Sequence, residues 1–418
     1  MTDTTETGPV LTADGTPLKK KLAQALFLSR LRAFGLVAPL LLFIIVSFII
    51  PILSLLWRGV ENDTYAVAMP ATTEMLATWD GASEPTEDMY AALVADLMLA
   101  REDKSIGRVA TRVNREVSGT RSMFTKSARK AKKLEPPFRA ALLDIDEDWG
   151  SLEVWGAMKI ASQTYSPAFY AAALDAQYNP DGSFERLAEN KRIYVYLFIK
   201  TMLISLTVTL ACLALGYPVA WLLANLPTRT SNLLMILVLL PFWTSLLVRT
   251  TAWIAMLQSQ GVLNNIFVWL GITSDDARFS LIYNMTGTII AMTHILLPFM
   301  VLPLFSVMKS IPPTYVRAAK SMGANDWTAF WRVYFPGTVP GIGAGALLVF
   351  ILSIGYYITP ALVGGQDGQL ISNFIAFHMQ KSLNWSLAAA LGGILLVIVL
   401  GFYWLYDKVV GIDNMKMG

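Results

Sequence analysis

Six long apolar stretches constrain this sequence more than any other feature. They cover residues 33–57, 193–224, 232–257, 281–306, 338–363 and 383–406. About 20 helical residues cross a hydrocarbon core about 30 Å thick, so each stretch is long enough to span a bilayer. Only 15% of the residues are charged, against about 25% in ordinary soluble chains. We therefore predict an all-α polytopic membrane protein with six transmembrane helices.

The basic residues of the short connecting loops predict the orientation, because Lys and Arg favour the cytoplasmic side. Two basic residues, Arg278 and Lys381, lie in the loops of one side. The other side, which we predict to be cytoplasmic together with both termini, holds Lys19, Lys20, Lys21, Arg30, Arg32, Arg229, Lys309, Arg317, Lys320, Arg332, Lys408 and Lys416.

The spacing of the spans predicts four regions. Residues 1–32 form a cytoplasmic N-terminal segment, and 33–57 the first transmembrane helix. Residues 58–192 form an extracytoplasmic insertion, and 193–418 a five-helix core with a cytoplasmic segment at 312–336. The i, i+4 spacing of Met89, Leu93 and Leu97 predicts that the insertion is mainly helical. Two interpretations stay open: the insertion only packs on the outer face, or it is a docking or gating surface for an external partner.

The sequence contains no pattern typical of a catalytic or metal site. It has no G-x-x-x-x-G-K-[ST] phosphate loop, one cysteine (Cys212) and two histidines (His294 and His378). We therefore expect a transport protein rather than an enzyme, with no metal or cofactor bound by this chain. We expect no nucleic-acid partner.

A polar segment, Val316 to Pro336, lies between the fourth and fifth stretches and is predicted to form a helix, a turn and a second helix. The first helix covers about 314–322, and Gly323 suits the left-handed residue that ends it. Asn325 or Asp326 caps the second helix, which ends near Pro336. Ala318 and Ala319 leave one face of the first helix nearly bare, so a cleft of another protein fits closely there. A helical hairpin lying on the membrane surface is the alternative.

This segment resembles the E-A-A-x-x-x-G signature of ABC importer permeases. Arg317-Ala318-Ala319, Gly323, Val333 and Pro336 match its spacing, with Arg317 in place of the leading glutamate. The resemblance implies the type I importer permease fold and a coupling helix seated in a groove of a separate ATPase subunit. The implied ATPase-coupling residues are Arg317, Ala318, Ala319, Gly323, Ala324 and Pro336.

A second resemblance narrows the family. "PFWTSLLVRTTAWIAMLQSQGVLNN", "LPFMVLPLF" and "PALVGG" are similar to the first permease of spermidine/putrescine-type importers, over about 193 to the C-terminus. The resemblance implies a bacterial inner-membrane location and a second permease subunit in a pseudo-twofold pair. It also implies two ATPase subunits that hold ATP and Mg, and a periplasmic solute-binding protein.

Polar residues near the outer ends of the spans are candidates for the substrate pathway or its gate. Arg249 either snorkels to water or lines the pathway. Pro298 cannot donate a hydrogen bond to the carbonyl of residue 294, so the backbone there is irregular. The His294 side chain either stabilises this irregular backbone or contacts the pathway. Lys200 is interpreted as a snorkelling lysine. The candidate pathway residues are Trp243, Thr244, Arg249, Tyr356, Tyr357 and Thr359.

Gly337, Gly341 and Gly345 recur every four residues, so they share one helical face that allows close helix packing.

The solute predicted by the resemblance is a small polar organic molecule of the polyamine type. Acidic residues typical of polyamine permeases are absent at Tyr356 and Ala361, and a polycation favours carboxylates in a passage of low dielectric constant. An opine, an amino-acid derivative or another carboxylated or zwitterionic solute is therefore the alternative. A stand-alone secondary transporter is a lower alternative, because no Asp or Glu lies in the apolar stretches.

Overall fold

The computed structural model describes residues 18–410 and is almost entirely helical. Five helices are long and apolar enough to cross a membrane: Ser29–Arg58, Tyr194–Asn225, Met285–Ser310, Asp326–Gly355 and Trp385–Lys408. A bent pair, Thr228–Trp243 and Leu246–Trp269, whose two halves meet at 97°, counts as a sixth candidate span if the two halves are taken together. The predicted all-α membrane fold is confirmed. The four domain boundaries stay a prediction, and residues 1–17 of the N-terminal segment and Lys416 lie outside the described residues.

The chain divides into two compact units, of which the first ends at Trp57. Its described part is one long helix, formed by α1 (Leu18–Ile44), the π-helical turn η1 (Ile45–Ile49) and α2 (Ile50–Arg58). The π turn ends two residues before Pro51. Proline has no N–H for the carbonyl four residues earlier, so the helix widens there instead of breaking.

The second unit, Arg58–Gly418, begins with the insertion, which we call the cap (58–192). Its helices are α3 (Asp63–Ala68), α4 (Pro70–Thr78), α5 (Glu87–Glu102), α6 (Ile106–Val113), α7 (Thr120–Lys130), η2 (Ala131–Lys133), α8 (Phe138–Leu143), η3 (Glu147–Gly150), α9 (Leu152–Ser162), α10 (Ala168–Ala173) and η4 (Glu189–Lys191). A short hairpin pairs β1 (Ala176–Tyr178) with β2 (Phe184–Arg186), antiparallel, with Tyr178 opposite Phe184.

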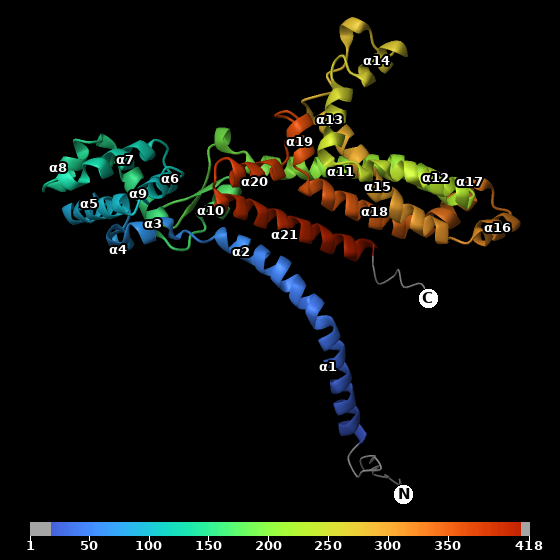
Figure 1. Ribbon diagram of the computed structural model, residues 1–418, viewed down its shortest axis with the longest axis horizontal. Coiled ribbons are helices and arrows are strands. Elements are labelled where there is room, and N and C mark those ends of the chain that lie inside the picture. The colour runs from blue at the N-terminus through green and yellow to red at the C-terminus, as the bar shows by residue number, and fades with distance from the viewer. Residues whose placement is uncertain (1–17, 411–418) are drawn as a thin grey trace. The chain divides into compact units, whose positions relative to one another are not determined.

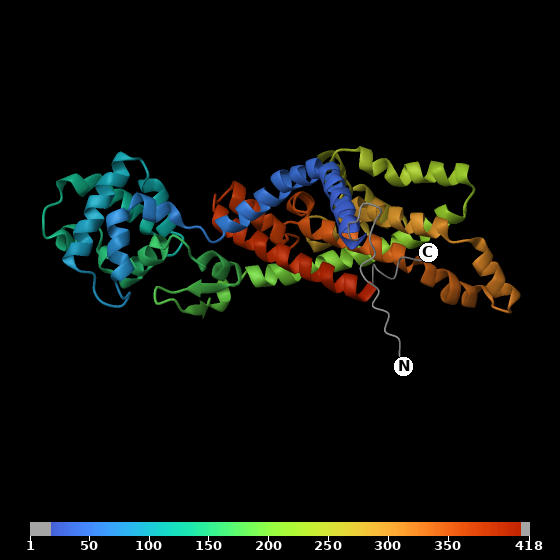
Figure 2. The same ribbon diagram turned by 90° about the horizontal axis from the view of Figure 1, so that it is seen from below.

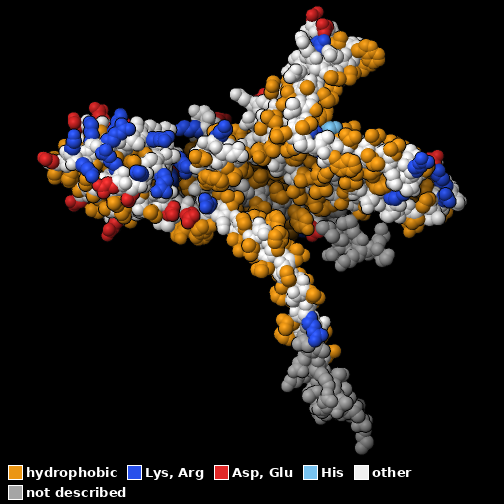
Figure 3. All heavy atoms as spheres, viewed as in Figure 1, with side chains coloured by type: hydrophobic (Ala, Val, Ile, Leu, Met, Phe, Trp, Pro, Cys, Tyr) orange, Lys and Arg blue, Asp and Glu red, His pale blue; other side chains and the backbone are white. Residues whose placement is uncertain are grey.

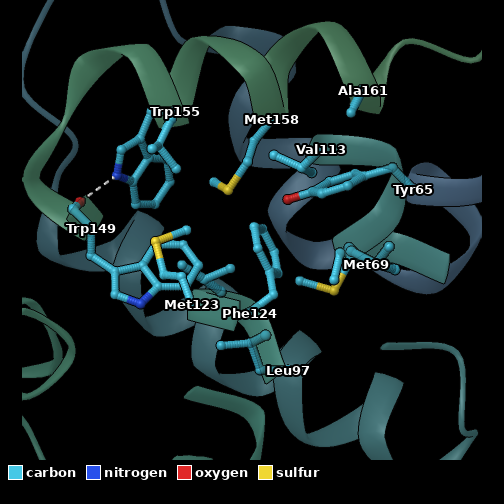
Figure 4. Close-up of a cluster of buried hydrophobic side chains, with 14 of the residues drawn as sticks. Tyr65, Met69, Leu97, Val113, Met123, Phe124, Trp149, Trp155, Met158 and Ala161 are labelled. Carbon is cyan, nitrogen blue, oxygen red and sulfur yellow. Dashed lines mark hydrogen bonds between the residues drawn. The ribbon is translucent and has the colours of Figure 1, made fainter. Parts of the chain in front are cut away.

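The cap has its own hydrophobic core. Side chains from α3, α5, α6, α7 and α9 meet around Trp149 and Trp155, both fully buried (Figure 4). The Trp149 indole donates to Ser127 Oγ at 2.8 Å, and its backbone carbonyl accepts from Tyr90 Oη and Trp155 Nε1, both at 2.9 Å. The cap is therefore a folded body rather than a loop.

Replacing Trp149 with alanine should destabilise the cap by about 3–5 kcal/mol, because a large buried ring would leave a cavity. Limited proteolysis of the full chain in detergent would measure this as faster cleavage within 63–173, with residues 194–408 still protected. Trp269, which is exposed, provides the matched tryptophan-to-alanine control. Equal cleavage of Trp149→Ala and the unmodified chain would contradict the prediction.

A buried arginine, Arg112 of α6, links the cap helices to the segment at the start of the cap. Arg112 is only 3% exposed, and its Nε donates to Asn62 Oδ1 at 2.6 Å while its Nη1 pairs with Glu116 at 2.7 Å. Asn62 in turn donates to the carbonyls of Ile160, Ala161 and Gln163. A buried guanidinium needs such partners, since an unpaired charge is costly away from water.

The cap also contacts the membrane core. Phe169 and Ala173 of α10 pack with Leu197 of α11 and Leu387 of α21. Arg115 Nη2 donates to the Leu383 carbonyl at 3.2 Å, and burial, with a smaller contribution from Arg112, lowers the pKa of Arg115 to about 10. The cap therefore lies against the loop that joins α20 to α21.

The core follows the cap. Its helices are α11 (Tyr194–Asn225), α12 (Thr228–Leu239), η5 (Leu240–Trp243), α13 (Leu246–Leu257), α14 (Val262–Trp269), η6 (Asp275–Ala277), α15 (Met285–Ser310), α16 (Pro313–Ser321), α17 (Asp326–Ala329), η7 (Phe330–Tyr334), α18 (Phe335–Gly355), α19 (Ile358–Val363), α20 (Ile371–Gln380) and α21 (Trp385–Val410). α11, α15 and α18 run side by side around a shared hydrophobic core (Figures 1 and 2). Hydrophobic side chains cover the face of these long helices (Figure 3), as expected for surfaces in contact with lipid.

Two predicted spans need correction. The stretch 232–257 is not one helix, because the chain is extended at Thr244 and Ser245 before α13 begins. The stretch 338–363 begins earlier and ends at Gly355, and Ile358–Val363 forms the separate short helix α19. Both breaks lie within apolar sequence, where a hydropathy average continues across them.

Candidate functional site

The polar segment forms the predicted helix and turn. α16 covers Pro313–Ser321, and Gly323 has φ +93°, in the left-handed region that favours glycine. The Gly323 N–H donates to the Lys320 carbonyl at 2.9 Å, and the Ala324 N–H donates to the Ala319 carbonyl at 3.0 Å. These two bonds close a Schellman motif, which fixes the direction in which the chain leaves the helix.

The next helix starts at a side-chain cap. Asn325 Oδ1 accepts from the Thr328 N–H at 2.8 Å, and Asp326 forms an ion pair with Lys320 across the turn. Asparagine at this position satisfies an N–H that has no partner within the helix. The turn is therefore held from both sides.

The predicted end of the second helix at Pro336 is wrong. α17, η7 and α18 form one continuous helix from Asp326 to Gly355. The π turn η7 ends two residues before Pro336, the same spacing that η1 shows before Pro51. Because the wider turn accommodates the missing N–H, the polar segment continues directly into the span.

The implied coupling residues do not share one surface. Arg317, Ala318 and Gly323 are exposed, whereas Ala319 is 5% exposed. On the same helix Val316 packs against the core that includes Tyr334. The exposed face of α16 is thus free for a partner, while Ala319 serves the packing of this chain. The role of these residues in coupling stays a prediction.

The break in the bent span brings three candidate pathway residues together. Ser245 caps α13 by accepting from the Val248 N–H at 3.2 Å. Arg249, one turn later, donates from Nη2 to the Thr244 carbonyl at 2.9 Å and from Nε to Thr244 Oγ1 at 3.4 Å. Trp243 is 78% exposed just before the break. Arg249 therefore donates hydrogen bonds to Thr244, whose backbone is extended and lies outside the helix.

The break after α18 is held by a neighbouring helix. The carbonyls of Tyr356 and Tyr357 accept from Ser372 Oγ and Asn373 Nδ2, both at 2.7 Å. Thr359 is buried, and its Oγ1 lies 3.3 Å from Thr250 Oγ1 of α13. The two broken spans thus meet at a pair of threonine hydroxyls.

His294 contacts the same region from α15. Its Nδ1 accepts from Trp253 Nε1 at 3.1 Å, and the two ring centroids are 5.2 Å apart. Arg249 and Trp253 lie on the same helix, α13, four residues apart, so Arg249 is on the helix that contacts His294. The candidate pathway region around the two breaks therefore contains an arginine, a histidine and aromatic rings. None of the residues named in it here carries a carboxylate.

Lys200 lies elsewhere. Its side chain is 8% exposed near the N-terminal end of α11, with Nζ 5.7 Å from the Tyr196 ring centroid. Tyr196 lies one turn nearer the start of the helix and is 63% exposed, so the ammonium group points toward that end. The snorkelling interpretation stays a prediction.

The three glycines face α15. A Cβ at Gly341 would lie 3.0 Å from Val307 Cβ and 3.2 Å from Leu304 Cα, and one at Gly345 would lie 3.2 Å from the Met300 carbonyl. A Cβ at Gly337 would meet the Ile311 side chain at 3.2 Å. All three glycines allow close contact within this chain, so nothing here requires a second permease at that face.

Comparison with known proteins supports a transport component of the ABC importer class. The family model described as "Binding-protein-dependent transport system inner membrane component" matches residues 216–410. The spermidine/putrescine transport system permease protein PotB of Escherichia coli (strain K12) is 37% identical over 216 residues, which cover 51% of this chain and 78% of that protein. PotB of Haemophilus influenzae is 32% identical over 225 residues, covering 54% and 78%.

A solved bacterial ABC transporter that imports the acidic polysaccharide alginate is also similar, at 21% identity and a TM-score of 0.40, covering 51% of this chain and 80% of that one. On the strength of the sequence matches, the chain belongs to the family of binding-protein-dependent transport system inner membrane components. It is a multi-pass inner-membrane permease and not itself an enzyme. The resemblance predicted from the polar segment is thereby confirmed. The family match does not include the cap.

Sequence reasoning missed four residues of this region: Thr250, Trp253, Ser372 and Asn373. Trp253 stands four residues after Arg249 on the same helix, so its i, i+4 spacing was a usable signal, whereas Thr250 directly follows Arg249 and does not share its face. Ser372 and Asn373 act through contacts with residues 16 positions earlier, and no local pattern indicates such contacts.

Proposed function

We propose that this chain forms half of the transmembrane pathway of an ATP-driven importer, beside a second, related permease subunit. The observation that carries the proposal is the mechanical continuity of α16, its glycine turn and the helix Asp326–Gly355. That helix has 30 residues and is about 45 Å long at 1.5 Å per residue. A force on α16 therefore reaches the far end of the span without crossing a flexible loop.

The partners follow from this arrangement. Two ATPase subunits bind ATP and Mg, and one of them receives the exposed face of α16 in a groove. A periplasmic binding protein delivers the solute on the opposite side. Closure of the ATPases shifts the permease pair between two conformations by binding one of them more tightly, and no covalent chemistry occurs in this chain.

The orientation is part of the proposal. The basic residues of the short loops named above favour a cytoplasmic location for both termini and α16, and a periplasmic location for the cap. The continuous helix supports this placement because it ends on the side where the cap contacts α20 and α21.

The solute proposed first is of the polyamine type, because relatives named as spermidine/putrescine permeases are up to 37% identical. A carboxylated or zwitterionic solute is the second candidate. The cluster of Arg249, His294 and Trp253 favours it, since a fixed guanidinium attracts a carboxylate and repels a polycation.

Uptake into proteoliposomes containing the full importer tests both the function and the solute. We expect ATP-dependent uptake that requires the binding protein. If the solute is carboxylated, replacing Arg249 with methionine should reduce its uptake about tenfold. If the solute is a polyamine such as putrescine, the same substitution should leave its uptake unchanged or raise it. Lys408→Met, which removes a basic residue near the C-terminal end of α21, is the control. Gradient-driven uptake by this chain alone would contradict the proposal and favour a stand-alone secondary transporter.

A further inference from the structure

A cavity of about 690 Å³ lies beside α16, where the ends of α11 and α15 meet the polar segment. Asn225 is the last residue of α11, and Ser310 the last of α15. Two transmembrane helices therefore form one wall of the cavity, and α16 with η7 forms the other.

The charges around the cavity are mainly positive. Lys309, Arg317 and Lys320 line it, and Asp326 is the one carboxylate among its described lining residues. Lys320 is paired with Asp326, and Lys309 Nζ donates to the Ala224 carbonyl at 3.2 Å. Within the part of the chain that the structure describes, no ion pair or side-chain hydrogen bond engages the Arg317 guanidinium. The cavity thus has an excess of two positive charges.

The rest of the lining is apolar and aromatic. Met308, Ile311, Val316 and Phe330 are partly or fully buried around it, and Trp221 stands at its edge on α11. Lys and Arg side chains gather at this end of the core, next to a hydrophobic surface (Figure 3). A small inorganic anion would pair with the basic side chains but would make no contact with the apolar wall.

We propose that this cavity binds an anionic phospholipid of the inner leaflet. Its headgroup phosphate lies between Arg317, Lys309 and Lys320, and an acyl chain follows the apolar wall between α11 and α15. Basic pockets between membrane helices on the cytoplasmic side are suited to such headgroups, and a guanidinium binds phosphate through two parallel hydrogen bonds. The proposal rests on the proposed orientation, which places α16 at the cytoplasmic surface.

The proposed lipid would contact the coupling segment directly. It would link α16 to the ends of α11 and α15 and hold the segment in the position that the ATPase meets. Lipid composition would then alter the coupling without any lipid contact to the solute pathway.

Native mass spectrometry of the purified full chain tests the proposal with phosphatidylglycerol and phosphatidylcholine as probes. We expect retained phosphatidylglycerol at a level at least fivefold above phosphatidylcholine. The double variant Lys309→Gln, Lys320→Gln should lose most of this preference. Lys408→Gln, which removes a basic residue that packs on Trp404 at the end of α21, should keep it.

Melting temperature and elution volume show whether the double variant folds, and Lys309→Gln alone replaces it if it does not. Equal retention of the two lipids, or unchanged preference in the variants, would overturn the proposal. A rise in melting temperature with inorganic phosphate as large as the rise with phosphatidylglycerol would also overturn the proposal, in favour of a soluble anion. Association with the ATPase is measured separately, so failure of the lipid site leaves the proposed function standing.

Discussion

Replacing Gly323 with valine is expected to abolish association with the ATPase subunit and, with it, solute uptake. Gly323 has φ +93°, a conformation that costs a β-branched residue about 1–3 kcal/mol. A Cβ at this position would meet no atom within 4 Å, so the effect comes from the backbone and not from a clash. Opening the turn breaks both bonds of the Schellman motif and reorients α16 relative to the span.

Co-purification of the ATPase subunit with each variant measures this effect. Gly323→Asn is the matched control, because asparagine tolerates left-handed backbone better than other residues with a side chain. We expect it to retain a large part of the association. The melting temperature of the isolated permease should change little in either variant, since Gly323 is exposed and outside the core. An intact complex with normal uptake in Gly323→Val would remove the basis for the coupling role.

The turn at Gly323 was predictable from the sequence because its signals are local. Pro312 and Pro313 at the start of the helix, a glycine after it and an asparagine two residues later each act on neighbouring backbone. The structure has α16 at Pro313–Ser321, against the predicted 314–322. The continuation through Pro336 was not predictable in this way. It depends on whether a π turn forms, and the same proline rule allows either a wider turn or a helix end.

The broken spans show a different limit. Hydropathy located the apolar stretches, yet the break at Thr244 and Ser245 leaves the average unchanged because Leu246 and Leu247 follow at once. What stabilises each break is a contact made in three dimensions: Arg249 to the Thr244 carbonyl, and Ser372 and Asn373 to the carbonyls after α18. The sequence predicts that Arg249 lies near the outer end of its span, but its bond to the Thr244 carbonyl depends on a break in the helix that hydropathy does not detect.

The cap shows what periodicity alone provides. The spacing of Met89, Leu93 and Leu97 predicted a helix, and all three are buried in α5. The partners of that helix come from residues up to about 60 positions away, among them the Trp149 carbonyl that Tyr90 binds. A lone arginine such as Arg112 carries no local signal of burial, since its partner Asn62 lies 50 residues earlier.

Replacing Gly341 with leucine is expected to separate α18 from α15 and to destabilise the core by about 1–3 kcal/mol or more. The added Cβ would lie 3.2 Å from both Leu304 Cα and the Pro303 carbonyl, which are backbone atoms that cannot rotate away. The whole of α15 must therefore move. Since α18 is the continuation of the coupling segment, uptake should fall together with stability.

Gly401→Leu is the matched control for this prediction, because a Cβ at Gly401 in α21 meets no atom within 4 Å. Each substitution replaces glycine within an apolar helix, so the gain of about 1 kcal/mol in helix propensity applies to both and cancels in their difference. The fraction of chain that elutes as a folded monomer after heating measures that difference. If Gly341→Leu elutes as Gly401→Leu does, then α15 and α18 already separate in the resting protein. The contact between them would then belong to only one of the two states through which the permease alternates.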